Sequence, residues 1–148
     1  MNESDTISAV ESAVSETIRQ QLDHLKRGRV ERTFTSDLAK ILEPYFVDEN
    51  VSADTFYNKH GQLIKKLDGH SIELDIVIHE RGIDDHNLVA IELETNNSPE
   101  RDDIWKLEKM TEELGGFGYK LGLFLVVGIS SRAGEIITME WYKNGRRL

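Results

Sequence analysis

The sequence contains no cysteine among its 148 residues. This absence excludes a disulfide framework, a thiolate zinc site and catalysis by a cysteine nucleophile. It also fits a reducing compartment, and we therefore expect a cytoplasmic protein.

Long apolar runs and an excess of positive charge are absent as well. No stretch is long and apolar enough to cross a membrane, and the first residues lack the basic and apolar regions of a secretory signal. The 18 Lys and Arg residues stand against 27 Asp and Glu residues, which gives a net charge of −9. Because an acidic surface repels phosphate backbones, nucleic-acid binding would require a local basic patch or bound metal ions.

The length predicts one domain over residues 1–148. It begins with a predicted helix over residues 5–27, whose apolar residues recur at spacings of three and four. They are Ile7, Val10, Val14, Ile18, Leu22 and Leu25. We interpret residues 1–30 as an amphipathic N-terminal extension, whose apolar stripe could bind a protein partner or form a homodimer.

Periodicity and turn residues predict seven further elements. After a short hinge at residues 28–32, a helix begins at Thr35 or Ser36 and is limited by Pro44. The others are a helix from residue 99 to about residue 114 and strands at 51–58, 72–79, 88–94, 121–128 and 135–142. The order α-α-β-β-β-α-β-β indicates an α/β (α+β) fold with a central mixed sheet flanked by helices.

The strongest local signal is a β-hairpin over residues 72–94. Side chains alternate along both strands, which places Asp75, Glu92 and Glu94 on one face. An antiparallel register sets Asp75 opposite Glu92 and Glu73 opposite Glu94. Like charges at this spacing repel, so the acids raise their pKa, separate into solvent or share a cation, for which Mg²⁺, Mn²⁺ or Ca²⁺ is suited. The alternative is a hairpin whose acidic face is only solvated.

The residues around this hairpin resemble the PD-(D/E)XK nuclease-like superfamily. Asp75 lies in IELDIVIH and Glu92 in VAIELE, as the two motif acids do. Similarity to small bacterial members covers residues 35–128 and is carried by the runs DIVIHERG, NLVAIELE, DDIWKLEKMT and GYKLGLFL. The resemblance implies a restriction-endonuclease-like core in which Asp75 and Glu92 bind Mg²⁺ or Mn²⁺. A lysine orients the attacking water, and the implied reaction is hydrolysis of a DNA phosphodiester.

The sequence departs from this motif at two positions. Leu74 stands where the family often has proline, and Glu94 stands where it has the lysine. A carboxylate cannot replace the charge or the proton donors of a lysine, although Glu94 could act as a third metal ligand or as a base. Family members sometimes carry the lysine on the following helix, where Lys106 is the candidate. The alternative is that Lys106 only pairs with acids on the surface of that helix.

Other side chains are candidates for the same site. His79 shares the face of Asp75 and could be a ligand, a base or a structural hydrogen-bonding residue. Asp37 or Glu43 could supply the acid that the superfamily often carries on its first helix. A phosphate-facing patch or a solvated basic surface could be formed by Lys59, Lys65, Lys66, Lys143, Arg146 and Arg147. We interpret Trp105 and Trp141 as packing residues.

Three functions follow from these residues. The first is a Mg²⁺-dependent nuclease acting on DNA, with Asp75, Glu92, Glu94 and Lys106 as its catalytic residues. The second is a nuclease-fold protein without catalysis, which acts in binding or assembly through a protein partner. The third is a plain divalent-metal-binding module.

Overall fold

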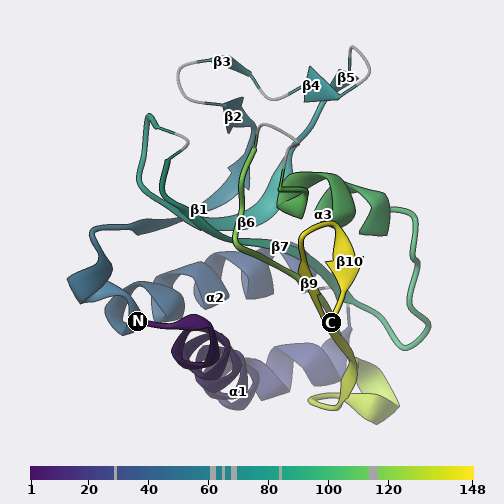
Figure 1. The fold of residues 1–148 in the computed structure, drawn as a ribbon. Coiled ribbons are helices and arrows are strands. Elements are labelled where there is room, and N and C mark those ends of the chain that lie inside the picture. The colour runs from purple at the N-terminus through teal and green to yellow at the C-terminus, as the bar shows by residue number, and fades with distance from the viewer. Residues whose placement is uncertain (29, 61–62, 65, 68–69, 84, 114–116) are drawn as a thin grey trace.

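The computed structural model describes the chain except for residues 29, 61–62, 65, 68–69, 84 and 114–116. It is a mixed α/β structure with a six-stranded sheet and helices on both faces (Figure 1). The helices are α1 (Glu3–Arg27), α2 (Glu31–Tyr45) and α3 (Ile104–Thr111), with 3₁₀ turns η1 (Val47–Glu49) and η2 (Ser130–Arg132). The strands of the sheet are β1 (Ser52–Tyr57), β6 (Leu74–His79), β7 (Asn87–Thr95), β8 (Leu121–Val127), β9 (Ile136–Lys143) and β10 (Arg146–Arg147). Two small hairpins between β1 and β6 consist of β2 (Lys59–His60) with β3 (Leu63–Ile64) and β4 (Lys66–Leu67) with β5 (His70–Ser71).

The strand order in the sheet is β1-β6-β7-β8-β9-β10. All neighbouring strands are antiparallel except β7 and β8, which run parallel. A parallel pair needs a crossover connection, and α3 with its flanking loops provides it. As a result, α3 lies on one face of the sheet against β7, β8 and β9 (Figure 1).

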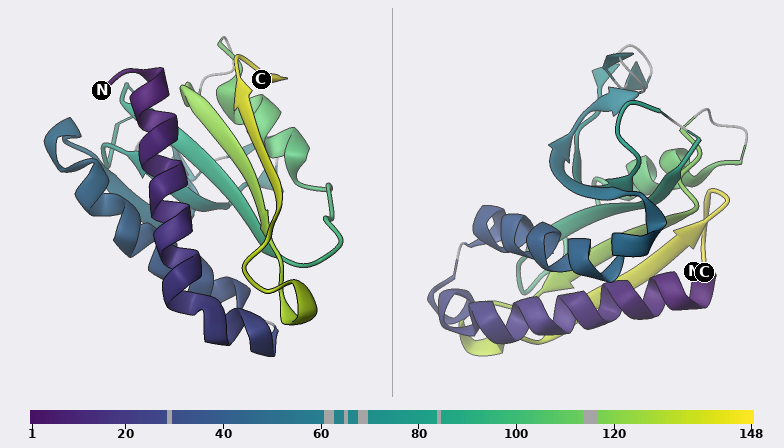
Figure 2. Two further views of the ribbon diagram at one scale, coloured as in Figure 1. Left: turned by 90° about the horizontal axis from the view of Figure 1, so that it is seen from below. Right: turned by 90° about the vertical axis from the view of Figure 1, so that its left-hand side faces the viewer.

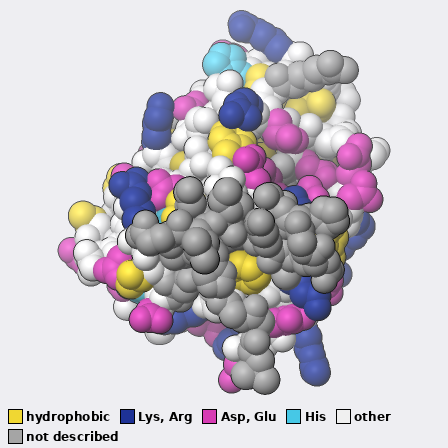
Figure 3. Space-filling model, turned by 90° about the horizontal axis from the view of Figure 1, so that it is seen from above, with side chains coloured by type: hydrophobic (Ala, Val, Ile, Leu, Met, Phe, Trp, Pro, Cys, Tyr) yellow, Lys and Arg dark blue, Asp and Glu magenta, His cyan; other side chains and the backbone are white. Residues whose placement is uncertain are grey.

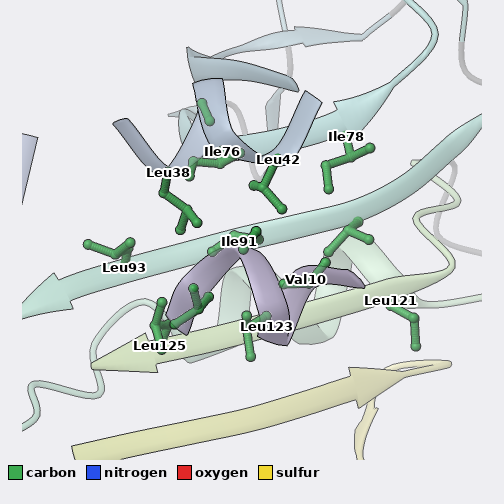
Figure 4. Packing of buried hydrophobic residues seen from close by; sticks show 14 of the residues in the cluster. Val10, Leu38, Leu42, Ile76, Ile78, Ile91, Leu93, Leu121, Leu123 and Leu125 are labelled. Carbon is green, nitrogen blue, oxygen red and sulfur yellow. The ribbon is translucent and has the colours of Figure 1, made fainter. Parts of the chain in front are cut away.

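Helices α1 and α2 cover the opposite face, as the two further views in Figure 2 show. Val10 of α1 and Leu38 and Leu42 of α2 pack there with the side chains of Ile91 and Leu123 from the sheet (Figure 4). Each fully buried side chain of this kind contributes about 1.5–3 kcal/mol. The apolar stripe of α1 therefore completes the chain's own core and is not an exposed surface for a dimer or protein partner.

The face under α3 has a second apolar cluster. Leu107 and Met110 of α3 are fully buried against the sheet, where Phe124 of β8 lies in the same cluster. Gly122 permits this close packing, because a Cβ at that position would lie 3.2 Å from Thr111 Cγ2. All seven residues of β8 are buried, which confirms the prediction of a central strand covered on both faces. No helix in the described part of the chain is long and apolar enough to cross a membrane.

All eight predicted elements are present, but all three predicted helices begin elsewhere, and α1 starts at Glu3 and not at residue 5. Helix α2 starts at Glu31 and not at Thr35 or Ser36, so the end of the predicted hinge is helical. Helix α3 starts at Ile104 and not at Pro99. In its place the backbone N–H of Glu100 donates a hydrogen bond of 3.0 Å to Glu94 Oε2. This contact holds the segment against the end of β7 and delays the helix.

Strands β6 and β7 form the predicted antiparallel hairpin. Ile76 pairs with Ile91 and Val77 pairs with Ala90, which is the predicted register and sets Asp75 beside Glu92. The ladder ends at Ile76, however, and Glu73 is exposed outside the strand. The predicted pairing of Glu73 with Glu94 is therefore wrong.

The side chains of β6 depart from regular alternation at Asp75. Ile76 packs on the side of α1 and α2, whereas Leu74 packs in the cluster under α3. On the neighbouring strand the register places Phe56 opposite Asp75, and Phe56 has a φ of 50°. A positive φ is uncommon for a bulky side chain, and it marks the position where the β1–β6 pair changes faces. A strictly alternating strand, as predicted from the sequence, does not describe this end of the hairpin.

Candidate functional site

Asp75 and Glu92 lie side by side on adjacent strands beneath α3. Glu92 has an exposed fraction of 3%, and the neighbouring carboxyl group of Asp75 acts on its titration. Asp75 Oδ2 also accepts a hydrogen bond of 2.8 Å from the backbone N–H of Leu93. This N–H lies beyond the paired part of the β6–β7 ladder, so the Asp75 side chain satisfies it in place of a backbone carbonyl.

Glu92 is a buried carboxyl group whose loss of hydration is only partly offset by the charge of Lys106. Burial and the neighbouring Asp75 raise the pKa of Glu92 well above its ordinary value, and Lys106 opposes this shift only in part. Glu92 Oε1 is buried and accepts no hydrogen bond from the residues that the structure describes. A buried polar atom left unpaired costs about 1–3 kcal/mol. A carboxyl oxygen that accepts no hydrogen bond from the described residues, beside a second carboxyl group, fits the oxygen donors that hold Mg²⁺ or Mn²⁺.

Lys106 carries a positive charge from α3 to these acids. Its Nζ atom lies 3.9 Å from Glu92 Oε1 and 3.2 Å from Asp103 Oδ1. Burial lowers the pKa of Lys106, but Glu92, Asp103 and Asp75 together raise it above its ordinary value. The ammonium group is therefore charged at neutral pH. The sequence left open whether Lys106 faces the motif acids or pairs on the helix surface, and the structure shows both contacts.

Glu94 lies two residues after Glu92 on β7, and its hydrogen-bond partner is the loop before α3. Its carboxylate accepts the hydrogen bond from the Glu100 N–H, as described above. Burial, followed by the charges of Glu100 and Glu31, raises the pKa of Glu94, although the Glu100 N–H opposes the shift. The position of the motif lysine is thus filled by an acid that anchors the loop before α3.

Glu31 on α2 is a further acid that acts electrostatically with Asp75, and the sequence analysis missed it. Glu31 Oε1 accepts a hydrogen bond of 3.1 Å from the Thr95 N–H at the end of β7. Burial raises the pKa of Glu31, the Thr95 N–H lowers it, and the charge of Asp75 adds to the net rise. Glu31 therefore lies within electrostatic reach of the motif acids. Placing the start of α2 at Val30 would have put this acid in the first helical turn and made it a candidate.

The two acids proposed for this role lie elsewhere. Asp37 accepts a hydrogen bond from the side chain of Gln21 on α1. Glu43 accepts a hydrogen bond of 3.2 Å from the backbone N–H of Ala53 on β1. Neither contact joins the carboxyl group to Asp75 or Glu92.

His79 belongs to a separate polar group on the same face. Its Nε2 atom lies 2.8 Å from Asp54 Oδ2, and its ring packs edge-on against Tyr57 with 4.3 Å between the centroids. Arg81 also pairs with Asp54 at 2.8 Å. Hydrogen bonds from Arg81, and more weakly from His79, lower the pKa of Asp54 although burial opposes the shift. Of the three alternatives for His79, these contacts fit a buried structural residue that forms hydrogen bonds.

The acids do not converge into a group of three. Among the residues that the structure describes, no three His, Asp or Glu side chains lie close enough together to hold a metal ion. Figure 3 shows the molecule from above, where acidic and basic side chains are both scattered over the surface. A third protein ligand from Glu94 therefore remains a prediction.

The two tryptophans differ in environment. Trp141 is buried with an exposed fraction of 9%, as predicted, whereas Trp105 on α3 is 44% exposed. The prediction that Trp105 is a packing residue is therefore wrong.

The basic C-terminal residues pair with acids on different elements. Lys143 pairs with Glu3 on α1, and Arg147 pairs with Glu140 on β9. Lys65 lies outside the described residues.

Comparisons with known proteins add no relative. No protein-family model matches the chain, and no curated protein or solved structure is significantly similar to it. The functional argument rests on the geometry of the site.

Proposed function

We propose that this protein is a metal-dependent nuclease with a restriction-endonuclease-like core, in which Lys106 takes the role of the missing motif lysine. The observation that carries the proposal is the approach of the Lys106 ammonium group to within 3.9 Å of Glu92 Oε1. This brings together two acids and one lysine, as the motif requires, although the lysine comes from α3.

The order of elements supports the proposed core. The series α2, β1, β6, β7, α3 and β8 is a helix, three strands, a helix and a strand, which is the order of the superfamily. Asp75 begins the second of these strands and Glu92 lies in the third. Glu31 adds an acid from the first helix, beside the end of the third strand.

The residues fit a bound divalent cation. Asp75 and Glu92 would hold it, since Glu92 Oε1 is buried without a hydrogen-bond partner in the described part of the chain. Mg²⁺ is commonly bound through one or two carboxylates, with water and substrate phosphate as its remaining ligands. Two acids are therefore sufficient, even though no three converge. When bound, such an ion supplies Lewis acidity and lowers the pKa of water.

Lys106 would then act on the attacking water or on a phosphate oxygen. Its three N–H donors and its fixed charge can orient a water molecule and stabilise negative charge that develops at phosphorus. Asp103 holds the same ammonium group at 3.2 Å and restricts its position. Glu94 positions the loop before α3 through the Glu100 N–H, so its role is to place Lys106.

The proposal is tested by cleavage of single- and double-stranded DNA with Mg²⁺ and with Mn²⁺. We expect the wild type to cut, Asp75→Asn to be inactive and Lys106→Met to lose about 10²-fold or more in rate. Lys109→Met is the matched control, because Lys109 lies on the same helix, is half-exposed and pairs with Glu112. Its rate should stay close to wild type. Absence of cleavage by the wild type, or equal loss in both lysine variants, would contradict the proposal.

A second candidate is a nuclease-fold protein that binds DNA without cutting it. It is favoured by Glu94 in the position of the motif lysine and by the absence of a three-acid group among the described side chains. This candidate predicts DNA binding by the wild type that Asp75→Asn leaves unchanged, with no cleavage by either protein. Calorimetry with Mg²⁺ and Mn²⁺ separates it from the nuclease, since only the nuclease requires metal binding at Asp75.

A further inference from the structure

A largely covered carboxylate on β9, Glu140, holds two arginines on the face of the sheet that carries the acids. Glu140 has a side-chain exposed fraction of only 10%. Its Oε2 atom lies 2.6 Å from Arg101 Nη2 and accepts a hydrogen bond of 3.2 Å from the Tyr142 hydroxyl. Its Oε1 atom lies 3.6 Å from Arg147 Nη1.

Both guanidinium groups stay open to solvent. Arg101 is 48% exposed and Arg147 is 62% exposed. Each guanidinium has five N–H donors in a planar fork, and the contacts to Glu140 use only a few of them. Two guanidinium groups therefore share the single carboxylate of Glu140, in a chain of net charge −9.

This arginine pair lies in one row with the proposed metal ligands. Glu92 on β7 is in register with Phe124 on β8, and Phe124 is in register with Glu140 on β9. Adjacent strands are about 4.8 Å apart, so Glu140 lies roughly 10 Å from Glu92 along the row. The Arg101 guanidinium lies over the Phe124 ring, 5.6 Å from its centroid, and thus spans the space between the two acids. The charge of Glu94 also acts on Arg101, although more weakly than its hydrogen bond with Glu140.

We infer that Arg101 and Arg147 form a binding site for the phosphate backbone of a nucleic acid beside the acidic centre. The inference rests on the proposed function and names its substrate contact. Planar guanidinium groups bind phosphate through two parallel hydrogen bonds. Glu140 lies roughly 10 Å from Glu92 along this row, so a single phosphate group cannot occupy both places. The pair therefore holds a phosphate close to, but distinct from, the one at Asp75 and Glu92.

Glu140 holds both arginines in place before the nucleic acid arrives. It limits their motion and lowers the loss of side-chain freedom on binding. It also competes with phosphate for the same donors. Neutralising Glu140 should therefore strengthen the attraction of this surface for phosphate as long as the arginines stay near it.

The test is DNA binding in the presence of EDTA, which needs no metal and no cleavage. Fluorescence anisotropy of labelled single-stranded and duplex oligonucleotides is measured with the full chain over a series of salt concentrations. We expect Arg101→Ala/Arg147→Ala to bind at least ten-fold more weakly, and the slope of log K against log salt to fall by about two. Arg101→Lys/Arg147→Lys keeps the charges without the planar forks and should bind with intermediate strength. Glu140→Gln should bind several-fold more tightly.

The control is Arg19→Ala, because Arg19 is exposed on α1 on the opposite face of the sheet. It should bind DNA as the wild type does. Circular dichroism and urea unfolding establish that each variant is folded. Wild-type binding in the double alanine variant, an equal loss in Arg19→Ala, or no binding by the wild type would overturn the inference.

The result is separable from that of the cleavage assay. Loss of binding in the arginine variants of a chain that never cuts DNA would support the phosphate site and refute the nuclease. Metal-dependent cleavage with unchanged binding by the arginine variants would support the nuclease and refute the phosphate site. Inorganic phosphate that weakens wild-type DNA binding more than sodium chloride of the same ionic strength would support direct phosphate binding, and an equal effect of the two salts would contradict it.

Discussion

Ile91 and Glu92 are neighbours on β7, but they occupy opposite faces of the same sheet. Ile91 is fully buried against α1 and α2 in an apolar cluster. Glu92 is almost as deeply buried under α3, with an oxygen that accepts no hydrogen bond from the described residues and a second carboxyl group beside it. The two side chains are thus buried to a similar extent, but their burial has opposite effects on stability. The face of Ile91 stabilises the fold, whereas the face of Glu92 holds charges at an energetic cost, which is typical of functional sites.

The largest expected effect is on the apolar face. Ile91→Ala removes a fully buried branched side chain and leaves a cavity, so we expect it to lower the free energy of unfolding by about 2–5 kcal/mol. Urea unfolding followed by circular dichroism measures this loss. Because Ile91 faces away from the acids, we expect the folded variant to behave as the wild type does in the assays of the proposed metal binding and cleavage. A loss below 1 kcal/mol would show that this face is less tightly packed than described.

The adjacent substitution Glu92→Gln should have the opposite sign. The folded state raises the pKa of Glu92, so its contribution to stability is fully present below the ordinary carboxyl pKa and is lost as the pH rises through the folded pKa. We therefore expect Glu92→Gln to be more stable than the wild type at pH 8 by about 1–3 kcal/mol in metal-free buffer. The difference should vanish near pH 4.

The measurement is the urea midpoint of both proteins across this pH range. Subtracting the two profiles cancels the contributions of Glu31 and Glu94, whose pKa values are also raised. A difference that does not depend on pH would mean that Glu92 is not the group that titrates.

The smallest effect concerns Asp54, a carboxylate on the same face that is fully paired. The hydrogen bonds from Arg81 and His79 lower its pKa, so its contribution to stability is present above the ordinary value of 3.8 and is lost as the pH falls through the folded pKa. Asp54→Asn should cost about 1 kcal/mol at pH 7, because Arg81 is largely exposed to solvent. The cost should decrease below pH 4, which is opposite to the trend at Glu92. Thermal unfolding at pH 3.5 and pH 7 is the check, and a gain in stability at pH 7 would contradict it.

Local patterns in the sequence predicted the elements well because each carries its own periodicity. The alternation in β6 and β7 predicted their antiparallel register, and the continuous apolar run predicted that β8 is covered on both faces. The predictions failed where a tertiary contact overrides the local pattern. The Glu100 N–H bonds to Glu94 and delays α3, and the turn at Phe56 and Asp75 exchanges the faces of the hairpin.

The candidate site was predicted in part. Asp75, Glu92 and Lys106 were named from the sequence, and the structure brings them together. Glu31 was missed because its proximity to Asp75 depends on how α2 packs against the end of β7, across more than forty residues of chain. The arginine pair on Glu140 likewise joins residues from a loop, a central strand and the C-terminal strand.

The sequence by itself determined five of the six strands of the sheet, their order along the chain and the pair of acids on neighbouring strands, because these depend on local periodicity and short-range register. Only the tertiary structure decided that α1 completes the core and that the acidic face is buried under α3. It also decided that Lys106 of α3 places its positive charge beside Glu92. These features arise from contacts between distant segments. Their geometry is set by the packing of helices on the sheet, for which no local pattern in the chain is a signal.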